Sequence, residues 1–479
     1  MKKIIQIIFG GALVGLLFLS SCTKDWEEMN TDPNNPTIVP ATNLLGQAIR
    51  YFADNYYDAW FSMNNTGTYV GHLGKIQYLD ESRYYERESV INNVWTYLYY
   101  TVNDLESAKR LALEEDNLNL YAAALTFQTF AFSMGTDSWR DMPFFDAIKG
   151  DKGIVNPTYN TQEEIYPALL DSLKKAGDIF ADGNLGGTGN GDFLFNGDVE
   201  LWQRFANSLR LRLANRIANV SNVGVTHLQN VLNNATTYPI MEGNDHNAFL
   251  YWPGSSPYKE PWMEDSETRD DHAVGSYLID YMKSTADPRL PVYAKPATSD
   301  GEYRGVVPGV SDENLGSIAQ YSRIGARFRD DASGFTPFMR YSEVLFIIAE
   351  AAHNGHTAVM SATEAYNEAV IASNEENGVD GEAFLASIPF SEENLYLQKW
   401  VSLFKQSHEA WAESRRHDVP VMPAAPAARF EGHNRPPFRF AYPTSEANLN
   451  GANSAPYVAH VTDRFWGKKM WWDERTGVN

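Results

Sequence analysis

The segment from residue 338 to residue 374 reads FMRYSEVLFIIAEAAHNGHTAVMSATEAYNEAVIASN, and it decides how the fold is interpreted. Apolar residues recur at helical spacing on both sides of Gly355, a residue that commonly ends a helix. The pattern predicts one helix over Phe338–Asn354 and a second over Ser361–Asn374. Two helices joined by so short a connection pack side by side as an αα-hairpin.

The second helix of this pair carries a spacing of small and aromatic residues that is typical of tetratricopeptide repeats. Ala362, Tyr366 and Ala369 stand where the second helix of such a repeat places small, aromatic and small residues. The first helix matches partly, through Phe346 and Ala349, but a glutamate takes the place of the usual glycine. Elsewhere the repeats are degenerate, so these residues alone do not establish a regular array.

Helical patterns of similar length fill most of the remaining chain. Thr161-Gln162-Glu163-Glu164 resembles a capping box, and Thr42 is the expected N-cap of the first long helix. The predicted helices are Thr42–Met63, Glu88–Glu115, Asn119–Gly135, Thr161–Ala181, Asp198–Val220 and Glu392–Arg416. Strand patterns are sparse. The prediction is a mainly α protein built from tetratricopeptide-like αα-hairpins, with helical repeats over residues 42–237 and 338–418.

Two parts of the chain have a different composition. Residues 238–337 are dense in glycine, proline and aromatic residues, with one clear helix at Ala273–Ser284, and are too long for a bare loop. We interpret them as a large irregular insertion with its own packing. Residues 419–479 are proline-rich and form an irregular C-terminal segment. Residues 42–479 together are expected to form a single domain.

The N-terminus has the parts of a secretory signal. Lys2 and Lys3 precede an apolar run of about sixteen residues, which is shorter than the ~20 that a membrane-spanning helix needs. The run ends in Leu19-Ser20-Ser21-Cys22, which resembles the lipobox of bacterial lipoproteins. A lone cysteine is otherwise a buried small residue or a reactive thiol, but its position here predicts a signal peptide at residues 1–21 and acylation (palmitate) at Cys22.

The residues after Cys22 are expected to tether the protein to the membrane. Residues 22–41 combine the acidic stretch Thr23–Glu28 with a Pro- and Asn-rich run, which predicts an extended lipid anchor and tether. The acidic stretch is either a solvated linker or a surface-export signal like those of Bacteroidota-type lipoproteins. With a single cysteine, the chain forms no intramolecular disulfide.

The charge balance limits the classes of ligand. The chain has 61 acidic and 39 basic residues, for a net charge of −22. Nucleic acids are bound through clustered Lys and Arg, so this balance argues against a nucleic-acid ligand. It suits a secreted, soluble surface and a neutral or positively charged ligand.

Several motifs, in their order and spacing, resemble the SusD/RagB family of nutrient-binding outer-membrane lipoproteins. They are the lipobox, NTDPNNP (30–36), TDSWRDMP (136–143), DPRL (287–290), MRYSE through AEA (339–351), QKW (398–400), EAW (409–411) with Arg415-Arg416, and Tyr442-Pro443 with Glu446 and Asn450. The resemblance implies four tetratricopeptide-like hairpins that cradle a less regular half. It also implies capture of an oligosaccharide at the outer face of the outer membrane and delivery to a TonB-dependent, SusC-like barrel.

The resemblance places the ligand face on the loops after the first helix and on the insertion. Rigid aromatic faces in turn-rich segments are suited to stacking on sugar rings, and peptides use the same platforms. The predicted ligand-binding residues are Trp252, Trp262, Tyr258, Tyr251, Tyr78 and Tyr84, with Tyr85 and Phe249 in the same segments. The alternative is that the aromatic residues of the insertion form its core.

Other aromatic residues are assigned to structure. Trp95, Tyr97, Trp202, Trp400 and Trp411 lie in helical patterns and are expected in the core. The three C-terminal tryptophans, Trp466, Trp471 and Trp472, either seal the end of the fold, which we favour, or meet the barrel.

No catalytic motif stands out, so the chain is predicted not to be an enzyme and to need no cofactor or metal. Glu343 and Glu350 are about 10 Å apart on one helix, but the helix is densely apolar, which favours buried partners of arginines such as Arg340. His353 and His356 lack the zinc-protease spacing. A calcium site in the loop Asn184–Asp198 stays open. Besides glycan capture, we consider peptide capture, a surface-anchored hydrolase and a structural adaptor of the barrel.

Overall fold

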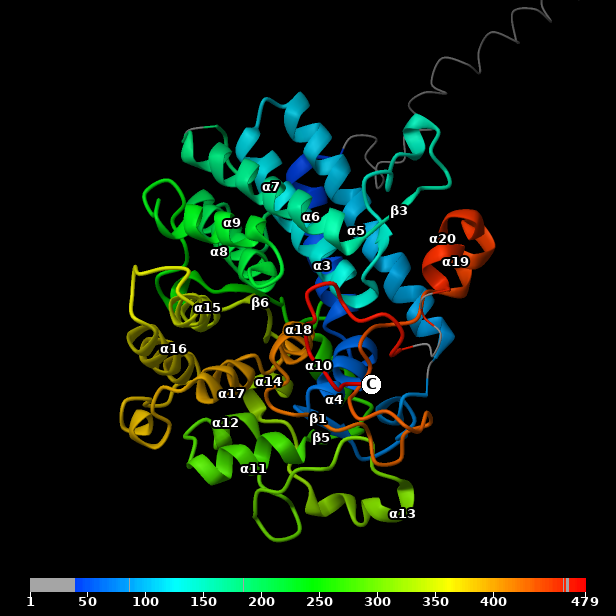
Figure 1. The fold of residues 1–479 in the computed structure, drawn as a ribbon, viewed down its shortest axis with the longest axis vertical. Helices are drawn as coiled ribbons and strands as arrows, with labels where there is room; N and C mark the ends of the chain where they lie inside the picture. The colour runs from blue at the N-terminus through cyan, green and yellow to red at the C-terminus, as the bar shows by residue number, and fades with distance from the viewer. Residues whose placement is uncertain (1–38, 86, 184, 460, 462–464) are drawn as a thin grey trace, which may run out of the picture. The chain divides into compact units, whose positions relative to one another are not determined.

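The predicted αα-hairpins are confirmed in the first half of the chain. The computed structural model describes residues 39–85, 87–183, 185–459, 461 and 465–479, and residues Ala41–Asn479 form one unit. Each long helix packs against the next along the chain, as Figure 1 shows. These helices are α3 (Ala41–Tyr56), α5 (Glu88–Glu114), α6 (Leu118–Trp139), α7 (Gln162–Ala181), α8 (Val199–Ile217) and α9 (Asn222–Leu232).

The second run of helices continues the row. Helix α15 (Tyr341–His353) packs against α8, its hairpin partner α16 (Ala362–Glu376) and α17 (Glu392–Ser402). The tetratricopeptide-like residues behave as expected, because Tyr366 is fully buried with its ring 6.3 Å from that of Phe346. The fold class is therefore as predicted, a mainly α protein of stacked αα-hairpins.

Four local predictions were wrong. Thr42 does not cap α3, which starts at Ala41; its hydroxyl instead accepts the Gly191 N–H at 3.1 Å and so contacts the loop between α7 and α8. Helix α3 ends at Tyr56 and not at Met63. The helix expected over 392–416 is two helices, α17 and α18 (Ser407–His417), separated at Lys405 by a left-handed residue with φ of 68°. Helix α9 was not predicted.

The irregular parts are joined to the helices by short antiparallel strand pairs. Strands β4 (Ala248–Tyr251) and β6 (Phe335–Met339) pair with each other and bring the two ends of the insertion together. Strand β1 (Leu73–Lys75) pairs with β5 (His272–Val274), so the loop region after α3 is held against the insertion. Strands β2 (Met142–Pro143) and β3 (Tyr159–Asn160) form a third pair.

Between the strands, the insertion has short helices rather than one long one. The helix predicted over 273–284 is α11 (Ser276–Thr285), because residues 273 and 274 belong to β5. Its other helices are α10 (Pro261–Ser266), α12 (Leu290–Tyr293), α13 (Asp312–Leu315) and α14 (Ala326–Arg329), and the C-terminal segment contributes α19 (Thr444–Leu449) and α20 (Gly451–Val458). No helix in the described part of the chain is both long and apolar enough to cross a membrane.

The core joins the repeats, the insertion and the C-terminal segment into one apolar cluster. The tryptophans assigned to structure are buried, and Tyr97 packs against the cluster half-buried. Trp466 and Trp472 are buried as well, which supports their sealing role. The Trp472 indole donates to Asp137 at 3.0 Å, so this tryptophan ties the C-terminal segment to the end of α6.

Candidate functional site

The site begins where α3 stops. Asp58 has an extended backbone, and its carboxylate accepts the Phe61 N–H at 2.7 Å, which caps a π-helix, η1 (Ala59–Thr66). Segments of π-helix are rare and frequently occur at functional sites. Trp60 is the second residue of η1, and 43% of its surface is exposed. Helix α18 packs against η1, which supports the segment that carries this tryptophan.

The pKa of Asp58 is raised by the same surroundings. Burial raises it to about 7, and the nearby carboxylates of Asp54 and Asp265 act in the same direction, while the Phe61 N–H partly opposes them. A carboxylate is stabilised less in a site of low dielectric, so its protonated form persists to a higher pH. The cap that fixes the position of Trp60 is therefore a group that titrates near neutral pH.

A chain of ion pairs runs beside Trp60. Lys75, at the end of β1, binds Glu81 at 2.8 Å, and the other oxygen of Glu81 accepts a hydrogen bond from the Arg87 guanidinium. The Arg87 guanidinium lies 5.1 Å from the Trp60 ring. Lys75 and Glu81 are buried, and paired charges of this kind hold their geometry. The ion pairs thus place donors and acceptors next to an exposed aromatic ring.

The predicted tyrosines of the loop after α3 lie around these ion pairs. Tyr78 is 62% exposed, with Arg269 5.4 Å from its ring, and Tyr85 is 37% exposed between Arg83 and Arg429. Tyr84 is buried, and its hydroxyl accepts the Ala425 N–H at 2.7 Å. Tyr78 and Tyr84 have φ of 49° and 70°. This left-handed backbone conformation is unusual for bulky residues, and it persists only where the surrounding structure holds it in place.

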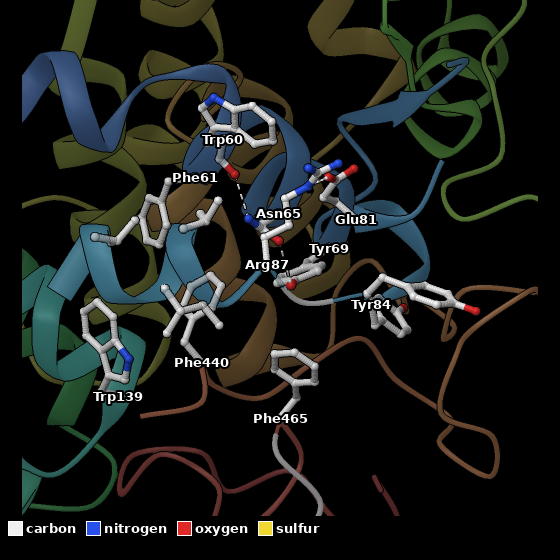
Figure 2. A pocket seen from close by; sticks show the side chains of 14 residues that line it. Trp60, Phe61, Asn65, Tyr69, Glu81, Tyr84, Arg87, Trp139, Phe440 and Phe465 are labelled. Atoms are coloured by element: carbon white, nitrogen blue, oxygen red, sulfur yellow. Dashed lines mark hydrogen bonds and ion pairs between the residues drawn. The ribbon is translucent and has the colours of Figure 1, made fainter. Parts of the chain in front are cut away.

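Two hollows adjoin at Trp60, Glu81 and Arg87, and Figure 2 shows the first. We call it the apolar slot. Its wall is mostly apolar and is formed by Trp60, Phe61, Asn65, Tyr69, Glu81, Tyr84, Tyr85, Arg87, Val90, Ile91, Val94, Trp139, Phe440 and Phe465. These residues come from η1, the short helix α4 (Gly67–Tyr69), the loop after β1, α5, the end of α6 and the C-terminal segment.

The second hollow, which we call the polar basin, has a wall rich in charged groups. It comprises Ala59, Trp60, Asn64, Lys75, Tyr78, Glu81, Arg87, Asp265, Arg269, Asp271 and His272, and encloses about 690 Å³ including the open space above it. Its charges are paired: Asp265 binds Arg329 at 2.6 Å, and Asp271 lies 3.8 Å from Arg269. Burial lowers the pKa of His272 well below its usual range, so this ring is neutral, with Nε2 2.8 Å from the Asn64 amide oxygen.

The predicted residues of the insertion lie elsewhere. Trp252 and Trp262 are 5% and 1% exposed; Trp252 donates to Thr336 at 2.9 Å, and Trp262 packs against Phe404. Neither ring has a free face on which a sugar could stack. Tyr251 and Tyr258 are exposed, but they line neither hollow; Tyr258 is covered by Arg50, at 3.9 Å. Their roles in ligand binding stay predictions, and the structure brings together only Tyr78, Tyr84 and Tyr85 from the predicted set.

Comparison with known proteins identifies the family of this chain. Residues 33–443 match the family model described as SusD-like, starch-binding associating with outer membrane. The chain belongs to the SusD-like family. This confirms the resemblance inferred from the sequence motifs, over most of the chain.

Solved structures agree with this assignment. A chitin-binding protein is 25% identical, with a TM-score of 0.79 over 91% of this chain and 100% of its own. A SusD homolog from Bacteroides vulgatus is 22% identical, with a TM-score of 0.80 over 92% and 98%. A chitin-binding SusD homolog from Flavobacterium johnsoniae is 22% identical, with a TM-score of 0.79 over 90% and 98%. A search of curated proteins gave no match.

Sequence reasoning missed Trp60, the aromatic residue that the two hollows of this SusD-like protein share. The apolar residues Leu45, Ile49, Phe52 and Tyr56 recur along α3, and Trp60 continues the same spacing by four residues. A helix extended through Trp60 would therefore bury it. The helix stops at Tyr56, and the turn capped by Asp58 rotates Trp60 outward. The available signal was Asp58 itself, an N-cap residue two positions before this aromatic residue.

The carboxylates weighed as catalytic groups are buried in the SusD-like core, as expected. Glu343 binds Arg212 through both oxygens, one of them at 2.6 Å, and Glu350 binds Arg416 and Asn215. The expected partner was wrong, because Arg340 pairs with Glu376 at 3.1 Å instead. These contacts are structural.

Two groups of possible metal ligands are also occupied by protein partners. In the loop 183–197, Asp192 accepts hydrogen bonds from Thr188 and the Trp202 indole, each at 2.7 Å, and from backbone N–H groups. Among the described residues, Glu350, Glu413 and His417 are close enough to share an ion. Lys399 lies 2.7 Å from Glu413, so a cation of the protein already compensates this cluster.

Proposed function

We propose that this SusD-like protein captures a neutral oligosaccharide at the cell surface through an arc formed by Trp60, Tyr78 and Tyr85. The single observation that carries the proposal is the exposed Trp60 ring, fixed by the cap of η1 at the junction of two hollows. Sugar rings present C–H faces to aromatic rings, and a few placed polar groups then fix their orientation.

The polar basin supports an uncharged ligand. Its carboxylates and guanidinium groups neutralise one another, so the basin offers many hydrogen-bond donors and acceptors without a strong net charge. Hydroxyl groups of sugars need both kinds of partner. The description of the family as starch-binding and the similarity to a chitin-binding protein point to the same class of ligand.

We infer that the captured glycan passes to a TonB-dependent, SusC-like barrel in the outer membrane. The family is described as associating with the outer membrane, which supports this location. The predicted acylated residue, Cys22, and the tether lie outside the described residues. Binding is proposed to occur without catalysis, because the strongest carboxylate candidates are held in buried ion pairs.

The test is calorimetric titration of the protein without its signal and lipid, against neutral glycans, acidic glycans and peptide mixtures. We expect saturable binding of at least one neutral glycan. Binding of peptides alone would replace the proposal with peptide capture. Release of shortened glycans during the titration, detected by mass spectrometry, would favour the hydrolase. If the barrel complex forms and no class binds, the protein is a structural adaptor.

A further inference from the structure

The wall of the apolar slot is mostly hydrophobic. Besides Trp60 and Arg87, the slot is lined by Ile91 and Val94 of α5 and by Phe440 of the C-terminal segment. Sugar hydroxyl groups placed against such a wall would lose their hydrogen bonds to water without replacement. The slot therefore suits an apolar substituent projecting from a glycan.

Two polar side chains that line the slot, Asn65 and Glu81, offer the donor and the acceptor that an amide needs. The Asn65 side-chain nitrogen donates one hydrogen to the Trp60 carbonyl at 2.7 Å, and its oxygen accepts from the Tyr69 hydroxyl at 3.2 Å. Because an asparagine amide carries two hydrogens, the second can be donated to a ligand carbonyl. The Glu81 carboxylate accepts one bond on each oxygen, and each oxygen has a further lone pair for a ligand N–H.

We propose that the apolar slot binds the N-acyl group of an amino sugar, so that the protein selects N-acylated glycans over their hydroxyl counterparts. The inference rests on the proposed capture of glycans. The acyl methyl lies against Ile91 and Val94, the carbonyl oxygen accepts from Asn65, and the amide N–H donates to Glu81. A hydroxyl in place of the acylamino group reaches none of the apolar wall.

Selectivity is measured on the unaltered protein with two pentasaccharides, β-1,4-linked N-acetylglucosamine and β-1,4-linked glucose. They share one backbone and differ at the acetamido group. We expect the acetylated sugar to bind about 10- to 20-fold more tightly, the combined effect of one buried methyl group and one hydrogen bond, because a hydroxyl group at the same position can still donate to Glu81. Equal affinities would overturn the inference and leave glycan capture intact. Binding of neither sugar, with binding of peptides, would overturn both.

A filling variant locates the selectivity. Ile91→Trp adds a ring to the wall of the slot and should lower the affinity for the acetylated sugar about tenfold, to that of the glucose sugar. Leu113→Trp is the matched control, because it adds the same ring to an exposed position of α5 about 33 Å away along the helix. Ile91→Phe replaces the first variant if that variant does not fold. Selectivity that survives the filled slot would overturn the assignment.

Discussion

Replacing Trp60 by alanine tests the platform directly. Trp60 is the aromatic residue shared by both hollows, and its ring is nearly half exposed while its backbone is fixed by the cap of η1. The substitution removes the stacking face and leaves the nearby ion pair of Arg87 with Glu81 in place. Because the side chain is not part of the closed core, the free energy of unfolding should change by about 1 kcal/mol or less.

The size of the binding loss follows from the exposed ring. A tryptophan side chain presents at most about 250 Å² of surface. With 43% exposed, about 100 Å² is open to a ligand. If a sugar covers between half and all of this area, the loss is about 1.3 to 2.5 kcal/mol at ~25 cal/mol per Å². The dissociation constant should therefore rise about 10- to 60-fold.

The assay is calorimetric titration of a glycan that the unaltered protein binds, with circular dichroism to confirm folding. Tyr100→Ala is the matched control, because Tyr100 is 60% exposed and lines neither hollow. It should bind as the unaltered protein does. A folded Trp60→Ala protein whose dissociation constant changes less than twofold would refute the platform. An equal loss in the Tyr100→Ala protein would show that the effect is not local.

Three further predictions concern the anchor, the core and pH. Cys22→Ser should abolish labelling of the protein with palmitate, and cell fractionation should show it moving from the membrane fraction to the soluble one. A variant that is still labelled and still found in the membrane fraction would contradict lipidation at this residue. Arg212→Met should lower the free energy of unfolding, measured in urea, by about 3–5 kcal/mol, because it leaves Glu343 buried without its cation. Adding Glu343→Leu should restore most of that loss. A lasting loss in the double variant would mean that packing, not charge, dominates. The pKa of Asp58 is about 7 in the folded protein, whereas an aspartate of the unfolded chain releases its proton at about pH 4. Between roughly pH 4 and 7 the folded protein therefore holds a proton that the unfolded chain has released. The contribution of Asp58 to stability falls as pH rises through this window. Asp58→Asn keeps a capping oxygen and should flatten that slope between pH 5 and pH 8; an unchanged slope would assign it to another group.

Most of the fold was predictable because periodicity is a local property. Tyr366 and Ala369 mark the second helix of a hairpin from their spacing alone, and both are fully buried against the expected neighbours. Element ends were less predictable. The break before α18 depends on Lys405, which has a left-handed backbone while its side chain binds Glu260 at 3.0 Å, far away in the sequence.

The candidate site was predictable only in part, because local sequence patterns do not show which distant residues cover a side chain. The loop after α3 was expected to present Tyr78, and it does. Turn-forming residues also surround Trp252 and Trp262, but turn chemistry describes the backbone and not what covers the side chain. Trp252 is buried because β4 pairs with β6, and Trp262 because Phe404 packs against it, and both partners lie more than eighty residues away.

The site lies where separate parts of the chain converge, and this has a consequence for specificity. Its walls come from η1, the loop after β1, α5 and the C-terminal segment, and they are held together by the β1–β5 pair and by α18. The αα-hairpins fix these segments through an apolar core that includes neither Tyr78 nor Tyr85. Changes at Tyr78 or Tyr85 can therefore alter the ligand without disturbing the core, because surface substitutions typically change stability by less than about 0.5 kcal/mol. Tyr84 differs, because its hydroxyl holds Ala425 and its ring lies 5.4 Å from Trp466, so a change there would move the C-terminal wall of the slot.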